Sequence, residues 1–223
     1  MINIISRHRL RAICGLILTL GLGSMPAAAE WTGVFVDIGE STTDLQFETV
    51  QRTMRIDSLN LAIEEKTTSP LRVGFSLGVS NIRTANLLPP ANAQKFDGGH
   101  LGFYLRYPQQ MGEHMSFEAL FSYRYNLASD SSTSVRSELE WREARVQLGL
   151  GAKFGALRIT PFIAYRDFNG DISNGISTQI FDSVDSISHG ISFDIFVEPT
   201  AYIRLQLFRG DEDGGYLTFA RVY

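Results

Sequence analysis

The sequence contains almost no cysteine and no long apolar run beyond its first residues. Its only cysteine, Cys14, lies in an apolar stretch near the N-terminus. A helical membrane protein needs runs of about 18 or more apolar residues, and the mean hydropathy of -0.02 resembles that of an ordinary water-soluble chain. Without the N-terminal stretch the chain has no thiol, which excludes disulfides and cysteine-based catalysis.

The first 29 residues have the pattern of a secretory signal peptide. A basic segment at 7–11 precedes an apolar run at 12–22, and small residues precede Glu30. The run is too short for a membrane-spanning helix, and no stop-transfer pattern follows. Cys14 lies inside the run rather than at the cleavage point, so we do not expect a lipoprotein anchor. We predict a removed signal peptide, 1–29, and one mature domain, 30–223.

The charge balance of the mature domain is acidic. The whole chain has 20 Lys and Arg against 24 Asp and Glu. The first 29 residues contain three arginines and no acid, so removing them leaves 17 bases against 24 acids and a net charge of -7. A nucleic-acid-binding protein would show a basic patch or stripe. We therefore expect no nucleic-acid partner.

Strict alternation of apolar and polar residues marks the segment from Arg142 to Phe168 as two strands joined at Gly155-Ala156. Even positions from Ala144 to Phe154 are apolar, whereas the intervening positions carry charged or small residues. This period of two is the signature of a β-strand. One apolar face and one charged face suit a barrel with lipid outside and a polar, filled interior.

The same alternation recurs along the mature chain and predicts ten strands. Long connections are expected at 83–97, 127–137 and 169–186, and a short acidic loop at 209–214. The end of the first strand is ambiguous: residues 39–44 form a loop, or the strand continues through Leu45 and Phe47. If the first two segments do not both span the membrane, the count is eight. The predicted fold class is an all-β, transmembrane, antiparallel up-and-down barrel.

The last strand adds a more specific resemblance. The chain ends on Tyr223, with Phe219 and Leu217 on the same face, although Arg221 departs from the pattern. This ending resembles the terminal strand of bacterial outer-membrane barrels of the OmpA and OmpX type. The resemblance implies a Gram-negative outer membrane, contact with its lipid and lipopolysaccharide, and recognition of the last strand by the barrel-insertion machinery. It implies an architecture that serves many functions.

A soluble lipocalin-like barrel is the main alternative, because its strands also alternate. Its faces are reversed, with an apolar interior that must be nearly free of unpaired charge. The secretion signal, the alternation of short and long connections and the aromatic C-terminus favour the membrane barrel.

The polar face should line the lumen. It has eight bases and six acids, including Asp37 and Glu64. In a barrel this narrow, such residues are expected to form ion pairs that fill the interior. The alternative is a narrow passive pore with a slight preference for anions. The predicted lumen-lining residues are Arg72, Arg106, Glu118, Arg124, Glu143, Arg145, Lys153, Arg158, Arg166, Asp194, Glu198 and Arg204.

Two weak catalytic patterns give a further alternative, outer-leaflet hydrolysis. His114-Met115-Ser116, with Glu118 nearby, is similar to the His-x-Ser element of lipid A deacylases, but it maps to a turn on the wrong side of the membrane. His100 and His189, with acids in neighbouring loops, are similar to the omptin proteases, whose chains are longer. We predict no enzymatic activity, no cofactor and no metal, and we interpret Asp211-Glu212-Asp213 as surface charge.

Overall fold

The computed structural model describes residues 33–67, 70–84, 94–130 and 136–223. The predicted signal peptide lies outside the described residues. Within these ranges, no helix is long and apolar enough to cross a membrane. Eleven strands make up the fold: β1 Gly33–Gln46, β2 Gln51–Lys66, β3 Arg72–Thr84, β4 Lys95–Gln110, β5 Met115–Ser129, β6 Glu138–Phe154, β7 Leu157–Ser173, β8 Thr178–Ser183, β9 Ile187–Glu198, β10 Ala201–Gly210 and β11 Glu212–Val222.

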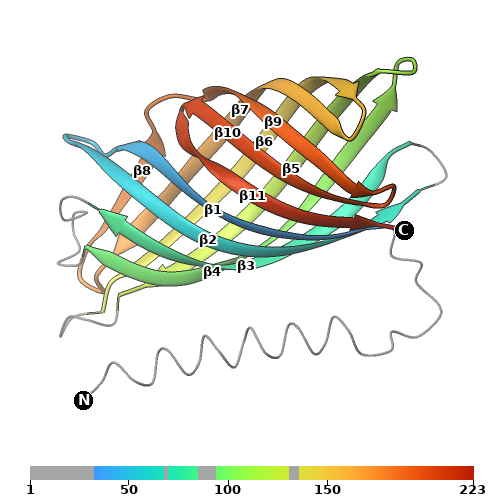
Figure 1. Cartoon of the computed structure of the whole chain (residues 1–223). Helices are drawn as coiled ribbons and strands as arrows, with labels where there is room; N and C mark the ends of the chain where they lie inside the picture. Colours follow the sequence, from blue (N-terminus) through green and yellow to red (C-terminus); the bar gives the residue numbers. More distant parts are fainter. Residues whose placement is uncertain (1–32, 68–69, 85–93, 131–135) are drawn as a thin grey trace, which may run out of the picture. The chain divides into compact units, whose positions relative to one another are not determined.

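Ten of these strands form a closed antiparallel barrel (Figure 1). Successive strands pair with their neighbours, and β11 closes the ring on β1 from Gly33 opposite Val222 to Thr43 opposite Glu212. The predicted all-β barrel of ten strands is confirmed, and with it the architecture of the outer-membrane barrels that the sequence resembles. The alternative of a single eight-stranded barrel is wrong. Strand β1 continues through Leu45, which agrees with the second alternative for the end of the first strand, a strand that extends past residue 44.

The two ends of the barrel differ in their connections. At the end that holds the C-terminus, here called the turn end, lie the links β2–β3, β4–β5, β6–β7 and β9–β10. The β6–β7 link is Gly155-Ala156, as predicted, and Gly155 has a φ of 60°. The opposite end, the loop end, holds the links β1–β2, β3–β4, β5–β6, β7–β8 and β10–β11.

The expected long connection at 169–186 is largely strand. Strand β7 runs to Ser173, and β8 returns beside it. Strand β8 also pairs with β1, through Leu45 opposite Ser183 and Gln46 opposite Asp182. Since β11 leaves β1 after Thr43, β8 takes its place at the loop end. The barrel therefore has ten strands through most of its length and a ring of eight, β1 to β8, at the loop end.

Along most of the barrel the apolar face points outward. On β6 and β7 the side chains of Leu150, Phe154 and Ile163 are 51%, 65% and 53% exposed, whereas Arg145 and Arg166 between them are buried. Similar outward rows occur on other strands, including Phe75, Leu101, Ile195, Leu205 and Phe219. This polarity is the reverse of a soluble barrel, so the lipocalin-like alternative is wrong.

At the loop end, the polarity of the inward and outward faces of the strands is reversed. There the inward side chains form one apolar cluster, consisting of Leu45, Phe47, Met54, Ile82, Phe96, Ala128, Leu139, Trp141, Phe168, Ile172 and Phe181. The outward side chains at the same end are charged, and Arg55 and Arg83 form ion pairs there with Glu40 and Asp57. We call the inward cluster the apolar plug. It fills the ring of eight strands.

Candidate functional site

The interior of the barrel toward the turn end contains a chain of alternating charges, here called the lower network. Seven side chains from seven strands take part, and each acid contacts two arginines. In order along the chain of contacts they are Arg72, Glu64, Arg106, Glu118, Arg204, Asp194 and Arg158.

The contacts in the lower network are short at its two ends and longer in the middle. Arg106 donates to Glu64 from Nε at 2.8 Å and from Nη2 at 2.5 Å. Arg204 donates to Asp194 from Nε at 2.6 Å and from Nη2 at 3.1 Å. Glu118 joins the two halves, with 3.5 Å to each of these arginines. Two N–H donors of one guanidinium group fix the position of the carboxylate that they contact. The lower network therefore links its seven strands across the interior.

A second group of ion pairs, the upper network, lies between the lower network and the apolar plug. Arg145 contacts Glu212 at 2.7 Å, and Arg166 donates to Asp211 at 2.5 Å and to the hydroxyl of Thr43 at 2.7 Å. Tyr216 donates to Glu212 at 3.1 Å. Burial raises the pKa of Asp211, which lies in the β10–β11 link, and the hydrogen bond from Arg166 opposes this shift.

Asp211 and Glu212 are inward partners that sequence reasoning missed. The sequence predicts surface charge at both positions, yet both residues are buried. Their inclusion changes the count of interior charge: between the apolar plug and the turn end, seven arginines face seven acids among the described residues, and a further acid, Asp130, is buried at the loop end. The seven acids are Asp37, Glu64, Glu118, Glu143, Asp194, Asp211 and Glu212. The cationic excess on which the expected anion preference depends is therefore absent from the buried interior.

Two of the predicted lumen residues are exposed near the turn end. Lys153 is exposed at the turn end, where its ammonium lies 4.9 Å from the ring centre of Phe196. Glu198 is also exposed, and its nearest cation is Arg221 at 3.9 Å. A register shift between β9 and β10 places Glu198 opposite Ala201, whereas Tyr202 pairs with Phe196. The side chain of Glu198 therefore points outward, on the same face as that of Ala201, and does not line the lumen.

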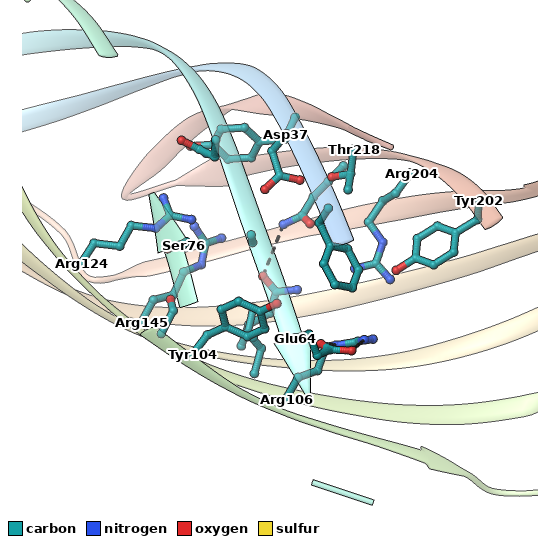
Figure 2. A pocket seen from close by; sticks show the side chains of 18 residues that line it. Asp37, Glu64, Ser76, Tyr104, Arg106, Arg124, Arg145, Tyr202, Arg204 and Thr218 are labelled. Atoms are coloured by element: carbon teal, nitrogen blue, oxygen red, sulfur yellow. Dashed lines mark hydrogen bonds and ion pairs between the residues drawn. The ribbon is translucent and has the colours of Figure 1, made fainter. Parts of the chain in front are cut away.

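A cavity of about 150 Å³ lies between the two networks (Figure 2). Arg124 of β5 and Arg145 of β6 extend into it from neighbouring strands, and Asp37, Tyr104 and Tyr202 line it elsewhere. Arg124 has no carboxylate within ion-pair distance among the described residues. Arg145 keeps its Nε and Nη2 without a hydrogen-bond partner. Glu143 lies opposite Arg124 in the strand register, on the neighbouring strand β6.

The apolar plug separates these polar layers from the loop end. Its ring contacts include Phe47 with Phe181 at 5.5 Å and Trp141 with Phe168 at 6.2 Å between centres. Trp141 is 2% exposed and Phe168 1%. Sequence reasoning missed the plug. Its signal is that inward positions change from polar to apolar where the strands approach the loop end.

The structure does not assemble either catalytic pattern. His100 points into the barrel and lies near Asn60, whereas His189 is exposed on the outer face of β9. His114 is in the exposed β4–β5 link, Ser116 faces the lumen, and Glu118 is held by two arginines. In the ranges that the structure covers, no three His, Cys, Asp or Glu side chains are placed to hold a metal ion together.

No family model matches the sequence, and no curated protein matches it. Solved structures with a similar fold include the translocator domain of autotransporter NalP from Neisseria meningitidis, with 12% identity, 98% of this chain and 97% of that chain covered, and a TM-score of 0.48. Neisserial surface protein A has 10% identity, coverages of 85% and 97%, and a TM-score of 0.45. Ail of Yersinia pestis has 10% identity, coverages of 86% and 98%, and a TM-score of 0.41. A likeness at this level does not identify a function.

Proposed function

We propose that this protein is an integral outer-membrane β-barrel with a closed lumen and a structural role in the cell envelope. The observation that carries the proposal is the outward apolar surface. Soluble proteins rarely expose contiguous apolar patches larger than a few hundred Å², whereas a membrane barrel needs an apolar band about 25 Å tall around its circumference. The exposed rows on successive strands supply such a band.

Three layers of packed side chains support the proposal of a closed lumen. The lower network spans the interior near the turn end, the upper network lies above it, and the apolar plug fills the ring of eight strands. A conducting pore requires a continuous water-filled path, and none of the plug side chains carries a charge that could attract a hydrated ion. We therefore favour a structural barrel over the narrow pore, and we propose no hydrolytic activity.

The orientation and partners follow the general plan of such barrels. Short turns and both chain ends lie on the periplasmic side and longer loops outside, so the turn end of this barrel would face the periplasm. Strand β11 pairs with both β10 and β1 and keeps Leu217 and Phe219 outward. We propose that this strand is the element read by the insertion machinery, and that lipid and lipopolysaccharide surround the outward surface.

Two measurements test the proposal. Expressed in a Gram-negative host, the protein should be recovered in the outer-membrane fraction and should migrate faster on a gel when unheated than when boiled. Recovery only in the soluble periplasmic fraction would contradict the membrane barrel. The purified protein in planar bilayers should give no unit conductance. Reproducible single-channel steps would replace the closed barrel with the narrow pore.

A further inference from the structure

A second cavity, here called the vestibule, lies beside the turn end and has a volume of about 190 Å³. Its lining includes Arg72 of β3, Gln110 of β4, Ser116 of β5, and Arg158 and Thr160 of β7. One water molecule occupies about 30 Å³ in the liquid. The vestibule therefore has room for a small polyatomic ion together with several waters.

The ion pairs of the lower network present their cationic side to the vestibule. The side chains of Arg72 and Arg158 are 20% and 21% exposed, whereas those of their partners Glu64 and Asp194 are fully buried. Glu118 is the single carboxylate in the lining, and Arg106 and Arg204 engage it. The accessible charge of the vestibule is therefore mainly that of two guanidinium groups.

Both guanidinium groups keep unused donors. Arg72 donates to Glu64 through Nη1, and Arg158 donates to Asp194 through Nε and Nη2. The remaining N–H groups of these two arginines have no acceptor among the described residues. None of them belongs to the buried, unpartnered atoms of the interior. They are thus available to a solute in the vestibule.

The backbone at Gly151 allows two hydroxyls to join these donors. A Cβ at this position would lie 2.6 Å from Oγ of Ser116, 2.9 Å from Oγ1 of Thr160 and 3.3 Å from Cδ of Arg158. These three side chains, from β5 and β7, therefore converge over the glycine of the strand between them. Any larger residue at 151 would displace them.

We propose that the vestibule binds a small tetrahedral oxyanion of the phosphate class. Guanidinium groups bind such oxyanions through short, charge-assisted hydrogen bonds, and serine and threonine hydroxyls donate to the remaining oxygens. The site is independent of whether the lumen conducts, so it goes beyond the structural role proposed above. The two proposals can fail separately: the barrel can be a membrane protein that binds no oxyanion in detergent micelles, and a barrel that binds the oxyanion can still prove to conduct ions.

The test is calorimetric titration of the folded protein in detergent micelles with inorganic phosphate, at constant ionic strength set by chloride. We expect saturable binding to one site. The double variant Ser116→Ala with Thr160→Val keeps every charge of the lower network and should weaken binding by about tenfold or more, since each lost hydrogen bond to a charged group changes affinity by about that factor. Arg72→Gln should weaken binding by a similar factor.

Arg221→Gln is the matched control, because Arg221 is an exposed guanidinium at the same end of the barrel but pairs with the outward Glu198. It should leave the affinity unchanged. Faster migration of unheated samples on a gel establishes that each variant is folded, and if Arg72→Gln does not fold, the double hydroxyl variant decides. Absence of saturable heat with the unaltered protein would overturn the proposal. Equal affinity in the hydroxyl variant and the unaltered protein would do the same.

Discussion

Arg106 on β4 and Glu64 on β2 meet across the interior, although β3 separates their strands. Two nitrogens of the guanidinium contact the carboxylate, at 2.8 and 2.5 Å, and Glu64 also accepts from Arg72 at 2.9 Å. The side chain of Glu64 has no exposure to solvent. One buried carboxylate therefore holds two arginines from two other strands.

Replacing Glu64 should destabilise the barrel strongly. Glu64→Gln removes the negative charge and leaves both arginines in a low-dielectric interior, and loss of one partner from a buried ion pair costs about 3–5 kcal/mol. We expect a decrease of that size in the free energy of unfolding, measured by urea titration in lipid vesicles. Glu113→Gln, in the exposed β4–β5 link, serves as control and should change stability by less than about 0.5 kcal/mol. Equal effects of the two variants would show that the network adds no stability.

The short strand β8 depends on one inward side chain. Phe181 packs against Phe47 and Phe168, with ring centres 5.5 and 6.1 Å apart, whereas Ile180 beside it is 71% exposed. Phe181→Ala should cost about 3–5 kcal/mol and release β8 from β1, because the two strands share a short pairing of two residue pairs and one further backbone hydrogen bond from Val184 to Asp44. We expect faster proteolysis within residues 174–186 of the folded protein.

Ile180→Ala is the matched control for this experiment, because it shortens a neighbouring apolar side chain that contributes nothing to the plug. It should leave the proteolysis rate near that of the unaltered protein. If both variants are cleaved at the same rate, the plug does not anchor β8, and the ring of eight strands is not a stable unit.

The strand faces were predictable from the sequence because outward-facing and inward-facing residues alternate strictly, as Val146 and Arg145 do. The inward position of Asp211 and Glu212 was not predictable, since a run of acids with glycines is typical of an exposed loop. Their burial is explained by ion pairs with Arg166 and Arg145, which are distant in sequence. The apolar plug was not predictable for a related reason. Trp141 continues the inward row of a strand that carries charged inward residues nearer the turn end, and periodicity alone does not show where the inward face changes from polar to apolar.

The tight β6–β7 turn tests backbone conformation separately from packing. Gly155 has a φ of 60°, and a Cβ added there would meet no atom within 4 Å. Gly155→Ala should therefore cost about 1–2 kcal/mol through conformational strain alone. Ala156→Gly, at the adjacent exposed position, should change stability by less than about 1 kcal/mol. Urea unfolding in vesicles measures both, and a neutral Gly155→Ala would show that the turn adopts another conformation.

Closure of the lumen from the loop end can be tested with a single introduced thiol, because the barrel from Gly33 onward contains no cysteine. Gln206 lines the central cavity and donates to Gln147 at 3.3 Å. The variant Gln206→Cys should react slowly with a charged, membrane-impermeant thiol reagent added from the loop side of oriented vesicles, since the apolar plug lies between the cavity and that side.

Adding Trp141→Ala and Phe168→Ala removes two of the largest side chains of the plug, and the reaction should then accelerate by an order of magnitude or more. Thr53→Cys, on the exposed face of β2, should react rapidly in both backgrounds and reports reagent delivery. Rapid labelling of Gln206→Cys with the plug intact would mean that the loop end is open, whereas slow labelling in both backgrounds would assign the closure to the upper network instead.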